Sequence, residues 1–129
     1  MKNEFIPYTE ALQMKELGFD EYCMGHFNNN HKLEISFTNY KNNDLLEWEA
    51  APLWQQAFRW FRKKYKLHAW WDTDGKGKWV WYINFMEKGD YFDSDCKDFD
   101  KTYNTPEEAQ LSLLQQLIKL VKDDRKTNE

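Results

Sequence analysis

The sequence predicts an α+β fold, in which a mainly antiparallel sheet of about four to five strands packs with three helices in two or three layers. Three observations predict it. Apolar residues recur at helical spacing in two long segments, short segments rich in β-branched and aromatic residues lie between them, and Asn- or Gly-containing turns join neighbouring strands. We expect one domain over residues 1–129, with frayed ends at 1–4 and 123–129.

The first helix is expected within residues 8–19, with Thr9 as its N-cap and Gly18 as its stop. Two strands should follow, at 21–27 and 32–38, joined by an Asn-rich turn. The second strand alternates apolar and polar residues, which predicts one buried face made of Leu33, Ile35 and Phe37.

The second helix is expected at 52–66, where Pro52 suits the first turn. Its apolar residues lie at i, i+3, i+4, i+7 and i+11, which is one helical stripe: Trp54, Ala57, Phe58, Phe61 and Tyr65. Its later half is basic, and positive charge there complements the negative end of the helix dipole.

A hairpin is expected next, with strands at 67–73 and 77–85 around the turn DTDGKGK, followed by a short strand within 90–96. The last helix should begin at the sequence Thr105-Pro106-Glu107-Glu108, which combines an N-cap, an N1 proline and a capping-box acid, and should run to about Lys122. Its buried stripe is Leu113, Leu114, Leu117, Ile118 and Val121.

The second strand of that hairpin is apolar on both faces, apart from Asn84. One face is Trp79, Trp81, Ile83 and Phe85, and the other holds Val80, Tyr82 and Met86. This pattern is typical of a central strand covered on both sides, so most of these aromatic residues are expected in the core. Trp70 or Trp71 is the best candidate for an exposed aromatic side chain, because adjacent strand residues point to opposite faces.

Composition limits the function classes. The formal net charge is −4, which argues against a general nucleic-acid binder, and 18% of the residues are aromatic. The two cysteines, Cys23 and Cys96, form no metal-binding or redox motif, and no signal peptide or membrane-length apolar segment is recognised. We therefore expect a cytoplasmic protein with no membrane association, no cofactor and no metal site.

Two charged clusters are the remaining candidates for chemistry. The basic run interleaved with aromatic residues could contact phosphates and stack a base, through Arg59, Trp60, Arg62, Lys63 and Lys66. The alternative is that this basic run is only a solvated helix face.

The acidic cluster from Asp90 to Asp100 could hold a divalent cation, or it could form a solvated strand edge that discourages further pairing. No nucleophile, phosphate-loop or zinc motif is present, so no catalytic residue is predicted.

Three stretches carry a resemblance: FIPYTEALQMKELGFDEYCMG, APLWQQAFRWFRKKYKLH and TPEEAQLSLLQQLIKLV. They resemble a group of small uncharacterised proteins of phage, prophage and other mobile elements in Bacteroides-like bacteria. The resemblance implies a bacterial or phage protein and carries no activity with it.

The function hypothesis that follows is a non-enzymatic accessory protein that acts through a protein partner or by self-association. One alternative is a nucleic-acid-binding module that uses the basic helix at 54–66. A second alternative is a metal-dependent hydrolase that uses the acidic cluster at 90–100.

Overall fold

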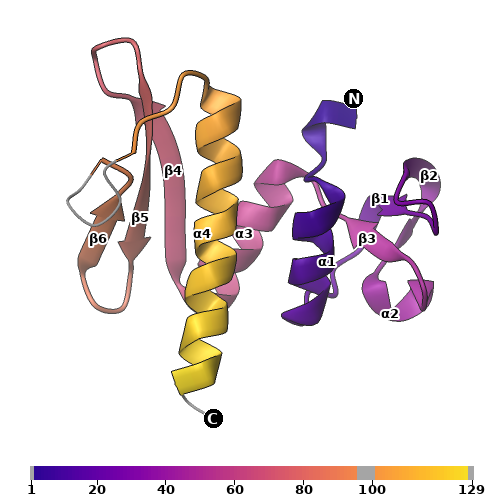
Figure 1. Ribbon diagram of the computed structural model, residues 1–129. Helices are drawn as coiled ribbons and strands as arrows, with labels where there is room; N and C mark the ends of the chain where they lie inside the picture. The colour runs from indigo at the N-terminus through magenta and orange to yellow at the C-terminus, as the bar shows by residue number, and fades with distance from the viewer. Residues whose placement is uncertain (1, 96–100, 128–129) are drawn as a thin grey trace. The chain divides into compact units, whose positions relative to one another are not determined.

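The computed structural model describes residues 2–95 and 101–127 (Figure 1). The chain divides into two compact units, Met1–Ala57 and Phe58–Glu129, with the boundary inside a helix. The α+β class and the antiparallel pairing predicted from the sequence are confirmed. The strands form two three-stranded sheets rather than one, and the described residues contain four α-helices rather than three.

The first unit contains a short 3-10 turn η1 (Lys2–Glu4), helix α1 (Tyr8–Glu16), strands β1 (Cys23–Phe27) and β2 (Leu33–Tyr40), the short helix α2 (Asn42–Leu45) and strand β3 (Glu49–Ala51). Its sheet has the order β2-β1-β3, and all pairs are antiparallel. Helix α1 packs on β3. The buried apolar side chains of this unit include Ile6, Ala11, Met14, Phe19 and Ala51.

The ends of α1 differ in how well the sequence predicted them. Gly18 has φ 98°, and the Phe19 N–H donates to the Met14 carbonyl, as in a left-handed helix stop. The helix begins two residues earlier than a Thr9 N-cap predicts, because Pro7 is the N-cap. Proline fixes the φ angle at this boundary without supplying a side-chain cap.

Strand β2 is exposed where the alternating pattern predicted burial. The register runs from Gly25 opposite Ile35 to Cys23 opposite Tyr40, so β2 carries extra residues that bulge away from β1. Phe37 lies within this bulge and is fully exposed, and Ile35 is also exposed. The expected buried face is therefore wrong for these two residues, because β2 is an edge strand and its bulge carries Phe37 off the sheet.

Helix α3 (Trp54–Tyr65) begins in the first unit and continues into the second, which also holds β4 (Leu67–Thr73), β5 (Trp79–Phe85), β6 (Asp90–Asp93) and α4 (Pro106–Thr127). The sheet order is β4-β5-β6, again antiparallel. Figure 1 shows α4 lying along this sheet, and it contacts β4 and β5.

The start of α4 follows the predicted capping sequence. The Glu108 N–H donates to Thr105 Oγ1, and the Glu108 carboxylate accepts from the Asn104 N–H. The predicted stripe from Leu113 to Val121 is entirely buried, which confirms its role as the helix's core face. The helix continues to Thr127, past the expected end at Lys122.

Candidate functional site

The sheet of the second unit has one covered face and one largely open face. On the covered face, Trp81 and Ile83 are buried, and the Trp81 indole N–H donates to Ser112 Oγ on α4 at 3.3 Å. Trp71 is half-buried on this side, with its ring 5.4 Å from that of Phe58. β5 is the central strand, as expected, but its other face is covered only in part: Val80 is buried there, while Tyr82 and Asn84 stay partly exposed.

The open face carries aromatic and polar side chains from all three strands. Strand pairing places Trp70, Tyr82 and Asp93 in one row across the sheet, and His68, Asn84 and Tyr91 in the next row. We name these six residues the aromatic face. Trp70 is 37% exposed and Tyr91 is 64% exposed.

Three rings of the aromatic face stack on one another. The Trp70 and Tyr82 ring centroids are 5.0 Å apart with 16° between the planes, and those of His68 and Trp70 are 5.2 Å apart at 28°. The ring surface of Trp70 that a base or sugar would stack on is thus partly covered by protein. Trp and Tyr combine an apolar ring with a polar group, which is why they are enriched at protein interfaces.

The polar groups of this face have no protein partner among residues 2–95 and 101–127. No hydrogen bond is made there by the Trp70 indole N–H, the Tyr82 hydroxyl, the His68 ring nitrogens or the Asn84 amide. Tyr91 also contacts no other ring within those ranges. A binding partner could satisfy these groups without displacing any existing contact.

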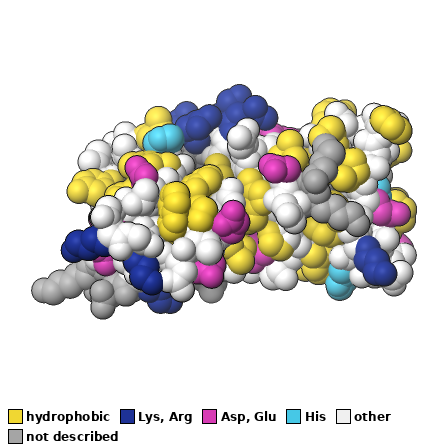
Figure 2. All heavy atoms as spheres, turned by 90° about the horizontal axis from the view of Figure 1, so that it is seen from above, with side chains coloured by type: hydrophobic (Ala, Val, Ile, Leu, Met, Phe, Trp, Pro, Cys, Tyr) yellow, Lys and Arg dark blue, Asp and Glu magenta, His cyan; other side chains and the backbone are white. Residues whose placement is uncertain are grey.

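Carboxylates surround the Tyr82 hydroxyl. Burial raises the pKa of Tyr82, and the negative charges of Asp93, Asp72, Asp74 and Asp95 raise it further. Asp72 shares the face with Trp70, two residues along β4, and Asp93 lies directly opposite Tyr82. Hydrophobic side chains reach the surface beside single Asp and Glu side chains in the view of Figure 2. Four carboxylates therefore act on the Tyr82 hydroxyl of the aromatic face.

The residues predicted to contact nucleic acid are only partly available. Arg59, Arg62, Lys63 and Lys66 are exposed. Trp60 is 6% exposed, its ring lies edge-on to those of Phe61 and Tyr65, and the Lys64 ammonium sits over it at 5.2 Å. The basic run thus offers positive charge, but its tryptophan cannot stack a base in this conformation.

The acidic cluster is only partly described, since Asp98 and Asp100 lie outside the described residues, as does Cys96. Asp93 ends β6, and Ser94 turns inward, with its hydroxyl accepting from the Trp81 N–H. Within the described ranges, no three His, Cys, Asp or Glu side chains come close enough together to hold a metal ion.

A surface pocket of about 390 Å³ lies at the end of the second unit where α4 finishes, with Leu67 and Val121 among its apolar lining. Its charged lining includes Lys66 and Lys88 together with Asp123 and Asp124. Because both signs of charge line it, the pocket favours no single class of charged ligand.

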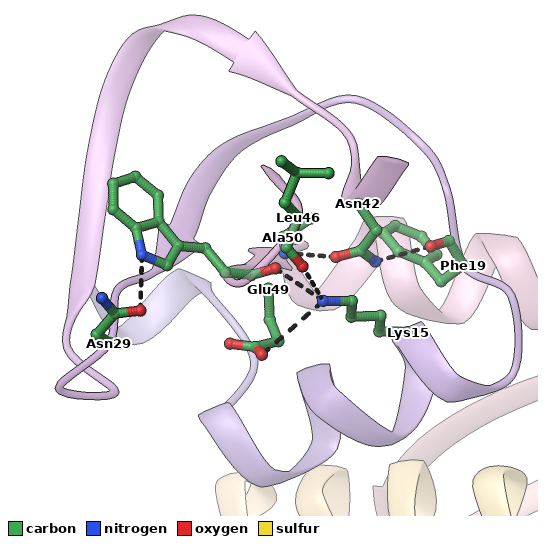
Figure 3. Close-up of polar contacts among 8 residues, drawn as sticks. Lys15, Phe19, Asn29, Asn42, Leu46, Glu49 and Ala50 are labelled. Carbon is green, nitrogen blue, oxygen red and sulfur yellow. Dashed lines mark hydrogen bonds and ion pairs between the residues drawn. The ribbon is translucent and has the colours of Figure 1, made fainter. Parts of the chain in front are cut away.

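Polar contacts within the first unit hold the loop between α2 and β3 (Figure 3). The Lys15 ammonium donates to the Leu46 and Trp48 carbonyls at 3.1 and 3.0 Å and lies 4.0 Å from the Glu49 carboxylate. Asn42 bridges the Phe19 carbonyl and the Ala50 N–H at 2.7 and 2.8 Å. All of these contacts are internal, so the cluster is a structural clamp rather than a binding site.

Cys23 is expected to be chemically inert. Burial raises the pKa of its thiol to about 12, the Glu21 charge raises it further, and a hydrogen bond to Gln56 opposes these effects. The reactive thiolate is therefore scarce at about pH 8.

We expect the Cys23 thiol of a Cys96→Ser protein to react with Ellman's reagent roughly a hundredfold faster in denaturant than when folded, measured by absorbance. Rapid reaction of the folded protein would contradict the burial of this thiol.

Over the part of the chain that the structure describes, no helix is both long and apolar enough to cross a membrane. Comparison of the chain with protein-family models, curated proteins and solved structures finds no match.

Proposed function

We propose that this chain is a non-enzymatic accessory protein that binds a protein partner, and that the aromatic face is its docking surface. The observation that carries the proposal is the stacked row of His68, Trp70 and Tyr82, which is solvent-accessible and has unpaired polar tips within the described residues. Rigid, clustered Trp and Tyr side chains are the residues most enriched among interface hot spots. The origin in a phage or mobile element stays a prediction.

Two features favour a protein over a nucleic acid as the partner. On the aromatic face, the charges that act on Tyr82 are those of carboxylates, which repel phosphate groups. The exposed basic residues lie on a helix whose tryptophan, Trp60, is buried. Stacking capacity and positive charge are therefore not combined in the way that single-stranded nucleic-acid sites require.

Replacing Trp70 with alanine is expected to weaken partner binding by at least about tenfold, the equivalent of about 1.4 kcal/mol. The reason is that Trp70 lies in the middle of the stacked row and supports the orientation of both neighbouring rings. The measurement is panning of a displayed library of random 12-residue peptides on the immobilised protein, followed by affinity measurement of the enriched peptides on the wild type and the variant.

Tyr22→Ala is the control, since Tyr22 is an exposed aromatic residue in the first unit, at 60% against 37% for Trp70. Enriched peptides should bind this control as they bind the wild type, and circular dichroism should show that both variants are folded. A failure to enrich any peptide, or enriched peptides that bind the Trp70→Ala protein with unchanged affinity, would overturn the proposal.

A further inference from the structure

We infer that the partner segment that docks on the aromatic face is positively charged and presents arginine side chains. This inference rests on the proposed function and adds the chemistry of the occupant. It follows from charge complementarity, since the carboxylates at the face would be brought out of water on binding and need cationic partners.

Strand register places two carboxylates around Tyr82. Asp93 lies directly opposite Tyr82 on β6, and Asp72 lies two residues beyond Trp70 on the same face of β4, opposite Val80. Residues directly opposite each other in an antiparallel pair share a face of the sheet. Asp72 accepts a hydrogen bond from the Thr73 N–H, and neither carboxylate has an ion-pair partner among the described residues.

The pKa of the Tyr82 hydroxyl is raised by its burial first, and then by the nearby charges of Asp93 and Asp72. The phenol therefore stays protonated over the physiological pH range and remains a hydrogen-bond donor and acceptor. No lysine or arginine contributes to the pKa shift of Tyr82, so no nearby positive charge offsets the effect of the carboxylates on its hydroxyl.

Arginine suits this arrangement better than lysine. A guanidinium is planar, so it can lie against an aromatic ring while its N–H groups pair with a carboxylate in two-point geometry. The Tyr91 ring offers such an open surface, since it is 64% exposed and lies in the row next to Tyr82 and Asp93. A lysine ammonium makes only the point-charge part of these contacts.

The test uses three defined probes, labelled 12-residue peptides that alternate glycine with arginine, lysine or glutamate, and fluorescence anisotropy with the full-length protein. We expect the arginine peptide to bind several-fold more tightly than the lysine peptide, and the glutamate peptide not to bind. We expect Asp93→Asn and Asp72→Asn each to weaken binding of the arginine peptide by about three- to tenfold.

Asp90→Asn is the matched control. Asp90 is on the same strand as Asp93 and lies opposite Phe85, so it points to the other face of the sheet. It removes the same charge from the whole protein without touching the aromatic face, and it should leave the affinity unchanged. Equal weakening by Asp90→Asn and Asp93→Asn would mean general charge attraction and would overturn the inference.

The two proposals fail separately. Library peptides that need Trp70 but are neutral or acidic would uphold docking at the aromatic face and overturn the arginine inference. An arginine peptide that binds the Trp70→Ala protein as well as the wild type would also overturn it, since the site would then lie elsewhere. Absence of any Trp70-dependent peptide would overturn both.

Discussion

Replacing Trp81 with alanine is expected to lower the free energy of unfolding by about 3–5 kcal/mol. Trp81 is 2% exposed in the centre of the second unit, between the sheet and α4. Its removal leaves a cavity the size of an indole and deprives Ser112 of a hydrogen bond from the ring N–H. Urea denaturation followed by circular dichroism measures the change.

Trp70→Ala is the control for this prediction, because it removes the same side chain from the neighbouring strand on the open face. It loses ring stacking with Tyr82 and His68, and it should cost only about 1 kcal/mol. A domain of this size has a total stability of roughly 5–15 kcal/mol, so the loss expected for Trp81→Ala is a large part of it. If the alanine variant does not fold, Trp81→Phe, which keeps most of the side-chain volume, takes its place. Equal costs for Trp81→Ala and Trp70→Ala would contradict the assignment of the two faces.

The two long amphipathic helices could be predicted from the sequence, and the reason is periodicity. In α4, apolar residues recur over several turns from Leu113 to Val121, and the capping sequence at Thr105 marks where they begin. The hairpin of β4 and β5 was predicted for a similar reason, because Gly75 and Gly77 take positive φ in the turn between two apolar runs.

The division into two sheets could not be predicted. Strand β3 has three residues and α2 has four, which is too short for a hydrophobic period to be recognised. Without β3, the sheet of the first unit lacks its third strand, and the sequence then predicts one sheet that joins β1 and β2 to the later hairpin. The sequence of a strand also does not indicate which strand from another hairpin it will pair with.

Only part of the candidate site could be predicted from the sequence. Trp70 was singled out as one of two exposed candidates, but Tyr82 was assigned to a covered face because its neighbours are apolar. The contrary signal was Asn84, which lies on the same face as Tyr82 and is a poor core residue. The grouping of His68, Asp72 and Asp93 around these rings depends on cross-strand register, which is a property of the folded sheet alone.

Replacing Asn42 with alanine is expected to lower the free energy of unfolding by about 2–4 kcal/mol, although the side chain is small and polar. The buried Asn42 amide donates to the Phe19 carbonyl and accepts from the Ala50 N–H, so it joins the end of the α1 segment to β3. Truncation removes a hydrogen bond from each of these two backbone groups, and the loss of a bond to a buried group costs about 1–3 kcal/mol. Chemical denaturation measures the loss.

Asn43→Ala is the control that distinguishes the buried Asn42 bridge from an exposed contact. The adjacent Asn43 also makes two hydrogen bonds across the same sequence distance, both to the Asp20 carboxylate, but it is exposed. Water can replace the bond that its side chain makes, so its removal should cost less than about 1 kcal/mol. A loss for Asn43→Ala as large as that for Asn42→Ala would mean that the number of contacts, and not burial of the bridged backbone groups, determines the stability of this loop.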